Sequence, residues 1–178
     1  MANTNDPNGF TPAYHMTGGT IRPAQMRIES AYGTAIYSGD VVNLSSGYII
    51  QGTATGAPVG VFAGVYYEAS DGSPTFSKYW TASTATLGSA DAKAYVYNDP
   101  DIVYEAQFTA GTPAVSFIGN KYTLTTTAGS SSTGRSAEGV TATTSSGVAL
   151  CVGFVDTPSN SIAAYARAFF RFPANPFE

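Results

Sequence analysis

The sequence predicts an all-β protein: an antiparallel β-sandwich or barrel, of the jelly-roll or β-tulip-like kind, with extended N- and C-terminal arms. Short runs of alternating, β-branched and aromatic residues recur about every ten residues, each bounded by Gly, Pro, Asn, Asp or Ser. Helical spacing over a comparable length is almost absent. The chain is also rich in Gly, Ser, Thr, Ala and Tyr, which is typical of a β-rich protein with a neutral surface.

The predicted strands follow one another in two halves of the chain. In the first half they cover residues 26–30, 34–38, 41–45, 47–52 and 59–69. In the second half they cover residues 92–97, 102–108, 114–119, 121–127, 147–155 and 162–172. Between the halves, residues 89–92 fit one turn of helix or a loop equally well. No repeat of fixed period is visible, which argues against a propeller or a solenoid.

Composition divides the chain into three parts. Residues 1–24 contain three prolines and three glycines without periodicity, which predicts an extended N-terminal arm that orders against a partner. Residues 25–172 form the β-rich domain, in which the Gly/Ser/Thr-rich stretch 128–147 is expected to be a flexible surface loop. Residues 173–178 contain two prolines and leave the sheet as a C-terminal tail.

Charge and composition exclude several classes of partner. The net charge of −4 has the wrong sign for binding phosphates, so nucleic acid is not an expected partner. No stretch approaches the ~20 apolar residues of a membrane span, and no basic segment precedes an apolar run at the N-terminus, so we expect no membrane partner and synthesis in the cytoplasm of a cell. Cys151 is the only cysteine, which excludes a disulfide within the chain, and VALCVGFV predicts that it is buried.

The segment NDPD, residues 98–101, places two carboxylates beside a proline. Proline presets φ, and Asn and Asp side chains bond their own backbone, so we interpret the segment as a turn between two strands. It lacks the alternating acids of an EF-hand loop, and no metal site is predicted. Asp99 or Asp101 with Glu105 could form a glycosidase-like acid pair only in an apolar cleft, which leaves a small hydrolase as a weak alternative.

Catalysis and cofactor binding are not expected. His15 is the only histidine and lies in the predicted arm, and no GxSxG elbow is present. Glycines at positions 52, 56, 60 and 64 match neither a dinucleotide-binding nor a phosphate-binding loop, so no cofactor is predicted.

Trp80, in FSKYWTAS, has two interpretations. An exposed tryptophan can be a platform on which sugars stack, which keeps a carbohydrate-binding or adhesin module as an alternative function. A tryptophan that anchors a core or a subunit interface is the competing interpretation.

Several stretches, taken in order, resemble a family of tailed-bacteriophage virion proteins, the head decoration or cement proteins. They are SGDVVNLSSG, GAPVGVFAGVYYEASDG, FSKYWTAS, AKAYVYNDPDIVYEAQF, VALCVGFVD and AYARAFFRF, and they span residues 38–172. The resemblance implies a β-rich, non-enzymatic protein on the outer capsid surface of the virion, bound to the major capsid protein and commonly a symmetric oligomer.

The expected mechanism is a clamp that holds neighbouring capsid subunits against the pressure of packaged DNA. A closed homotrimer at a local threefold axis is our first expectation and a dimer the alternative, with multivalent attachment raising the affinity. The residues predicted to bind a partner are aromatic: Phe10, Tyr14, Trp80, Phe169, Phe170, Phe172 and Phe177. An ordinary place in the core is the competing interpretation for at least half of them.

Overall fold

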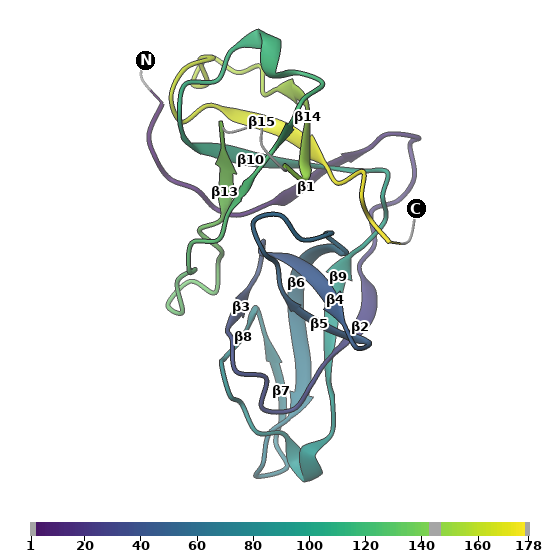
Figure 1. Ribbon diagram of the computed structural model, residues 1–178. Helices are drawn as coiled ribbons and strands as arrows, with labels where there is room; N and C mark the ends of the chain where they lie inside the picture. Colours follow the sequence, from purple (N-terminus) through teal and green to yellow (C-terminus); the bar gives the residue numbers. More distant parts are fainter. Residues whose placement is uncertain (1–2, 143–146, 177–178) are drawn as a thin grey trace.

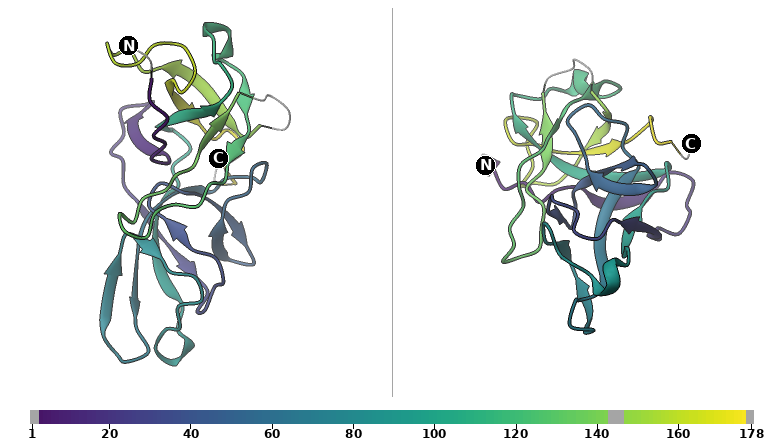
Figure 2. Two further views of the ribbon diagram at one scale, coloured as in Figure 1. Left: turned by 90° about the vertical axis from the view of Figure 1, so that its left-hand side faces the viewer. Right: turned by 60° about the horizontal axis from the view of Figure 1, so that its bottom comes forward.

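The computed structural model describes residues 3–142 and 147–176 and confirms an all-β protein (Figure 1). Two curled sheets are stacked one above the other, as Figures 1 and 2 show. We call the sheet that contains β2, β4 to β7 and β9, together with the small pair β3 and β8, the first barrel. We call the sheet that contains β1 and β10 to β15 the second barrel. Within the described ranges the helical segments are two short turns, η1 (Leu87–Ser89) and η2 (Val115–Phe117), and no helix is long and apolar enough to cross a membrane.

The first barrel is an antiparallel sheet whose two end strands, β2 and β5, lie against each other. Its path runs β2-β9-β6-β4-β5, and β7 pairs with β6. The small pair β3 (Ile36–Tyr37) and β8 (Tyr79–Trp80) adds Ile36 and Trp80 to the same core. The remaining strands are β2 (Ala24–Ile28), β4 (Val41–Ser45), β5 (Tyr48–Gln51), β6 (Gly60–Glu68), β7 (Pro74–Ser77) and β9 (Ala92–Tyr97).

The second barrel is a sheet with the path β11-β14-β15-β10-β13-β12, and β1 pairs with β10. Only Thr123 separates β11 from β12 in the chain, yet these strands are at opposite ends of the path, so the sheet curls into a nearly closed barrel. All its pairs are antiparallel except β10 with β13. Its strands are β1 (Thr11–His15), β10 (Ile102–Ala110), β11 (Lys121–Tyr122), β12 (Leu124–Thr125), β13 (Gly139–Thr141), β14 (Ala149–Phe154) and β15 (Arg167–Arg171).

The segment expected to be a free N-terminal arm is part of the second barrel. Strand β1 pairs with β10 from Thr11 opposite Glu105 to His15 opposite Ile102. Its proline is tolerated because β1 is an edge strand and the register shifts after Pro12, so a missing N–H breaks no regular ladder.

Three other expectations about the second half are corrected. The stretch 128–147, expected to be a flexible loop, contributes β13, and residues 143–146 lie outside the described chain. Residues 114–119, expected to be a strand, form η2, and in 162–172 only β15 is extended. Strand β13 depends on its distant partners β10 and β12, which a local pattern does not contain.

The C-terminal tail returns to the junction between the barrels and is not a free arm there. Asn175 is buried, and its Nδ2 donates hydrogen bonds to the backbone oxygens of Val59 at 3.2 Å and Asn98 at 2.8 Å. The tail therefore links both barrels as far as the described chain extends.

Candidate interaction surfaces

Four of the seven aromatic residues predicted to bind a partner are core residues, and the prediction is wrong for them. The ring of Phe10 lies 6.2 Å from that of Phe170 and 5.3 Å from that of Phe172, all three buried in the second barrel. Trp80 is fully buried in the first barrel, where its Nε1 donates to the backbone oxygen of Tyr32 at 3.1 Å. Its burial removes the residue on which the carbohydrate-binding alternative depended.

Tyr14 and Phe169 lie on the outer side of the second barrel. They flank β10 from β1 and β15, and their rings form an edge-to-face pair with centroids 5.5 Å apart. Tyr14 is 44% exposed and Phe169 is half-buried, because alternation along β15 directs the next residue, Phe170, into the core. Phe177 lies outside the described residues.

A second surface, which the sequence reasoning missed, crosses the first barrel. The strand register pairs Phe76 on β7 with Tyr66 on β6, Tyr66 with Lys93 on β9, and Lys93 with Arg27 on β2. Directly paired residues point to the same face of a sheet, so these four side chains form a continuous row. We call Phe76, Tyr66, Lys93 and Arg27 the outer row, because their neighbours Ala92 and Ala94 on β9 face the core.

The outer row combines aromatic rings with cations. The centroids of Tyr66 and Phe76 are 4.6 Å apart, and Nζ of Lys93 lies 5.7 Å from the centroid of Tyr66. Phe76 is 75% exposed, the highest value among the large hydrophobic residues described as exposed. A cavity of about 210 Å³ opens beside Tyr66 and Lys93. Exposed aromatic residues and arginine are enriched at protein interfaces, so this row is the strongest interaction surface in the described chain.

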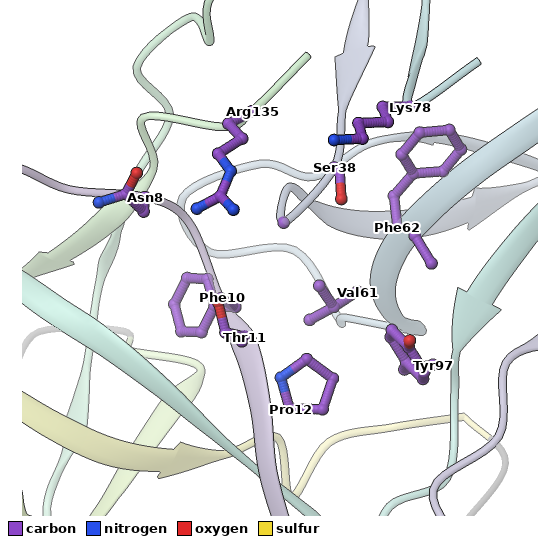
Figure 3. A pocket seen from close by; sticks show the side chains of 12 residues that line it. Asn8, Phe10, Thr11, Pro12, Ser38, Val61, Phe62, Lys78, Tyr97 and Arg135 are labelled. Atoms are coloured by element: carbon purple, nitrogen blue, oxygen red, sulfur yellow. The ribbon is translucent and has the colours of Figure 1, made fainter. Parts of the chain in front are cut away.

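A larger cavity of about 300 Å³ lies at the junction of the two barrels (Figure 3). Figure 3 shows Arg135 and Lys78 over this cavity, and Phe10 and Val61 are among its apolar lining. Its described lining includes these two cations and no acidic side chain. The cavity therefore suits a neutral or anionic polar group.

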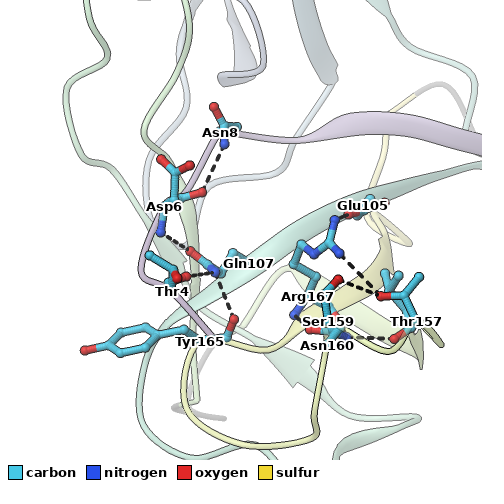
Figure 4. Close-up of polar contacts among 11 residues, drawn as sticks. Thr4, Asp6, Asn8, Glu105, Gln107, Thr157, Ser159, Asn160, Tyr165 and Arg167 are labelled. Carbon is cyan, nitrogen blue, oxygen red and sulfur yellow. Dashed lines mark hydrogen bonds and ion pairs between the residues drawn. The ribbon is translucent and has the colours of Figure 1, made fainter. Parts of the chain in front are cut away.

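Hydrogen bonds fix the first residues of the described chain to the second barrel (Figure 4). Gln107 is buried; its Nε2 donates to the backbone oxygens of Thr4 and Tyr165, each at 2.8 Å, and its Oε1 accepts the N–H of Asp6 at 2.9 Å. Asn3 donates to two backbone oxygens of the loop before β15. These contacts explain why a segment without strand periodicity is ordered.

The NDPD segment is a turn, as predicted, but it connects two different sheets. Oδ1 of Asp99 accepts the N–H of Asp101 at 2.9 Å, and β9 and β10 do not pair with each other. The same hydrogen bond, followed by one from His15, lowers the pKa of Asp99, which is the opposite of what a catalytic acid needs. Glu105 is occupied by an ion pair with Arg167 at 2.9 Å, so the suggested acid pair finds no support.

Two carboxyl groups are buried beside the junction. Oδ2 of Asp40 accepts the N–H of Tyr37 at 2.7 Å, and Oε2 of Glu138 accepts the N–H of Val41 at 2.8 Å. The other oxygen of each carboxyl group has no hydrogen-bond partner among the described residues. Hydrogen bonds to buried carboxyl groups hold the chain around residues 37–41 against the loop before β13.

Comparison of the chain with protein-family models, curated proteins and solved structures finds no match in any of the three. The functional argument therefore depends on the surfaces described above and on the sequence.

Proposed function

We propose that this protein is a virion structural protein that binds the outer surface of a tailed-phage capsid and stabilises the shell against packaged DNA. The outer row is the observation that carries the proposal. It presents the exposed ring of Phe76 against the half-buried ring of Tyr66, beside Lys93 and the Arg27–Asp91 ion pair, on a packed barrel, so little backbone ordering is needed on binding.

The outer row coincides with the sequence resemblance to head decoration proteins. Tyr66 lies in GAPVGVFAGVYYEASDG, Phe76 begins FSKYWTAS, and Lys93 lies in AKAYVYNDPDIVYEAQF. Three of the six stretches that resemble that family thus supply three of the four residues of the row, from three different strands. This coincidence supports a shared binding surface, since the strand cores alone would not require these outward-facing residues.

In this proposal the partner is the major capsid protein, and Phe76 is the anchor that it covers. A closed homotrimer remains our first expectation and a dimer the alternative, because a symmetric oligomer engages several copies of a weak site at once. Arg27 is paired with Asp91 at 3.3 Å, so Lys93 is the cation of the row that favours an acidic region of the shell, where charge complementarity raises the association rate.

Co-sedimentation with capsid shells tests the proposal. Shells assembled from the major capsid protein of the same phage, without decoration protein, are mixed with the purified chain and pelleted. We expect saturable binding, and we expect Phe76→Ala to weaken it by tenfold or more, as for a central aromatic anchor. Light scattering on the free chain gives the oligomeric state.

Val115→Ala is the matched control, because Val115 is a strongly exposed apolar residue of the second barrel. It should bind shells as the unchanged chain does. Absence of binding by the unchanged chain would refute the capsid proposal. Loss of binding in Val115→Ala but not in Phe76→Ala would place the contact on the second barrel.

A further inference from the structure

The end of β1 brings the chain's only histidine to the corner between β9 and β10. Nε2 of His15 lies 3.0 Å from Oδ2 of Asp99, although the two residues are far apart in sequence. The carboxylate of Asp101 joins them, and one ligand atom from each of the three residues lies within 4.8 Å of the others.

Two of these three side chains are already oriented by other hydrogen bonds. Oδ1 of Asp99 accepts the N–H of Asp101, which leaves Oδ2 directed at His15. The imidazole of His15 is only 8% exposed, and its Nδ1 lies 3.3 Å from the backbone N and 3.1 Å from Oγ1 of Thr17. In metal sites the second ring nitrogen of a histidine donates its N–H, whereas Nδ1 of His15 here accepts the N–H of Thr17, so metal binding at Nε2 requires the other tautomer, with Oγ1 of Thr17 as the acceptor.

We propose that His15, Asp99 and Asp101 bind a divalent transition-metal ion such as Zn²⁺. Ligand atoms about 2.1 Å from one zinc ion lie about 3.0 to 3.4 Å apart, a range that includes the separation between His15 and Asp99. The carboxylate of Asp101 lies within 4.8 Å of both other ligand atoms, so it must move closer to reach the same ion. One imidazole and two carboxylates favour zinc and its neighbours over magnesium, which prefers oxygen ligands alone.

The imidazole of His15 carries one ring proton both without and with the metal, and metal binding only moves this proton from Nε2 to Nδ1. Without metal, Nε2–H donates to Asp99 and Nδ1 accepts from the backbone of Thr17. With metal, the ring proton is on Nδ1 and donates to Oγ1 of Thr17, the N–H of Thr17 gives up its hydrogen bond to Nδ1 and turns to water, and the Nε2 lone pair binds the ion. Two carboxylates then neutralise the ion's charge, and the ion connects β1 to the corner that joins the barrels.

The test uses the untagged full chain, treated with EDTA and dialysed, and ZnCl₂ as the probe. Calorimetry should show one zinc per chain, and the melting temperature should rise by several degrees in excess zinc. Because the chain has one histidine, its ring signals in the NMR spectrum are unambiguous, and they should shift with zinc and not with equal MgCl₂.

Asp101→Asn removes a ligand but keeps the carboxylate and turn of Asp99, and it should weaken zinc binding at least ~10-fold. Asp91→Asn is the control, because Asp91 is paired with Arg27 away from the cluster, and it should bind as the unchanged chain does. Unshifted histidine signals at millimolar zinc would overturn the proposal. Zinc affinity in Asp101→Asn and His15→Gln that equals that of the unchanged chain would also overturn it, since zinc would then bind elsewhere. None of these outcomes depends on capsid binding.

Discussion

The carboxyl groups of Asp40 and Glu138 are both fully buried, and burial raises the pKa of each. Burial raises the pKa of Glu138 to about 9, and the negative charge of Asp40 contributes to the increase. Burial also raises the pKa of Asp40 to about 6, although hydrogen bonds from Ser136 and Tyr37 oppose it. At neutral pH the folded protein therefore keeps a proton on Glu138, because two buried carboxylates cannot both ionise cheaply.

We predict that the protein becomes less stable as pH rises from about 5 to 9. Both pKa values lie above the ordinary values of 3.8 and 4.5, so the folded state holds protons that the unfolded chain has released. The stabilisation is complete below the unfolded values and decreases by up to about 1.4 kcal/mol per pH unit for each proton. Urea denaturation at pH 5, 7 and 9 measures this slope.

Glu138→Gln is the control for that slope. The amide cannot ionise but can still accept the N–H of Val41, so the variant should depend less on pH and should be the more stable protein at pH 9. Equal or increasing stability of the unchanged protein between pH 5 and 9 would contradict the assignment.

Phe10→Ala should lower the free energy of unfolding by about 3 to 5 kcal/mol, because it leaves a cavity between Phe170 and Phe172. Phe76→Ala, at an exposed position, should change stability by less than about 1 kcal/mol. Thermal or urea denaturation of both variants gives the comparison. Similar small effects in both would show that the chain before β1 does not belong to the folded core.

Gly9→Ala should destabilise the protein by more than about 1 kcal/mol. Gly9 has φ +72°, and a Cβ there would lie 2.5 Å from Cβ of Ser136 and 2.6 Å from the backbone oxygen of Gly39. Gly18→Ala is matched to it, since Gly18 has φ +76° and nothing within 4 Å of the added carbon. The difference between their melting temperatures measures the steric part alone, and no difference would contradict the close packing at Gly9.

Cys151 should not react with thiol reagents in the native protein. It is fully buried, and burial raises the pKa of its thiol to about 11, which suppresses the reactive thiolate. Colorimetric thiol titration at pH 8 should show slow modification that becomes complete in denaturant. Cys151→Ser should cost about 1 to 3 kcal/mol, because a hydroxyl is harder to bury than a thiol. Fast native modification would place Cys151 at the surface.

The strands that the sequence predicts best are those with a clear period. In β10, alternation places Ile102, Tyr104 and Phe108 on one face, and all three are buried. Gln107, on the opposite face and expected at the surface, is nevertheless buried, because residues 4–6 cover it. A period identifies which side chains share a face but not whether a distant segment covers the other face.

The interaction surfaces were less predictable because they depend on register. Lys93 lies in a predicted strand, but Phe76 is on β7, which was not predicted, and their alignment with Tyr66 requires the pairing of three strands. His15 and Asp99 meet only because β1 pairs with β10, which the proline-rich composition of residues 1–24 concealed. The core position of Phe10, just before β1, was missed for the same reason.

The order of the strands also affects how the protein is synthesised. The first barrel uses residues 24–97 without interruption, whereas β1 must wait for β10, which leaves the ribosome after that barrel is complete. At about 5 to 20 residues per second, the delay is on the order of ten seconds. During that time the nascent chain carries Phe10 and Tyr14 without the strand that later binds them, so we expect these residues to be where a chaperone first contacts the growing chain.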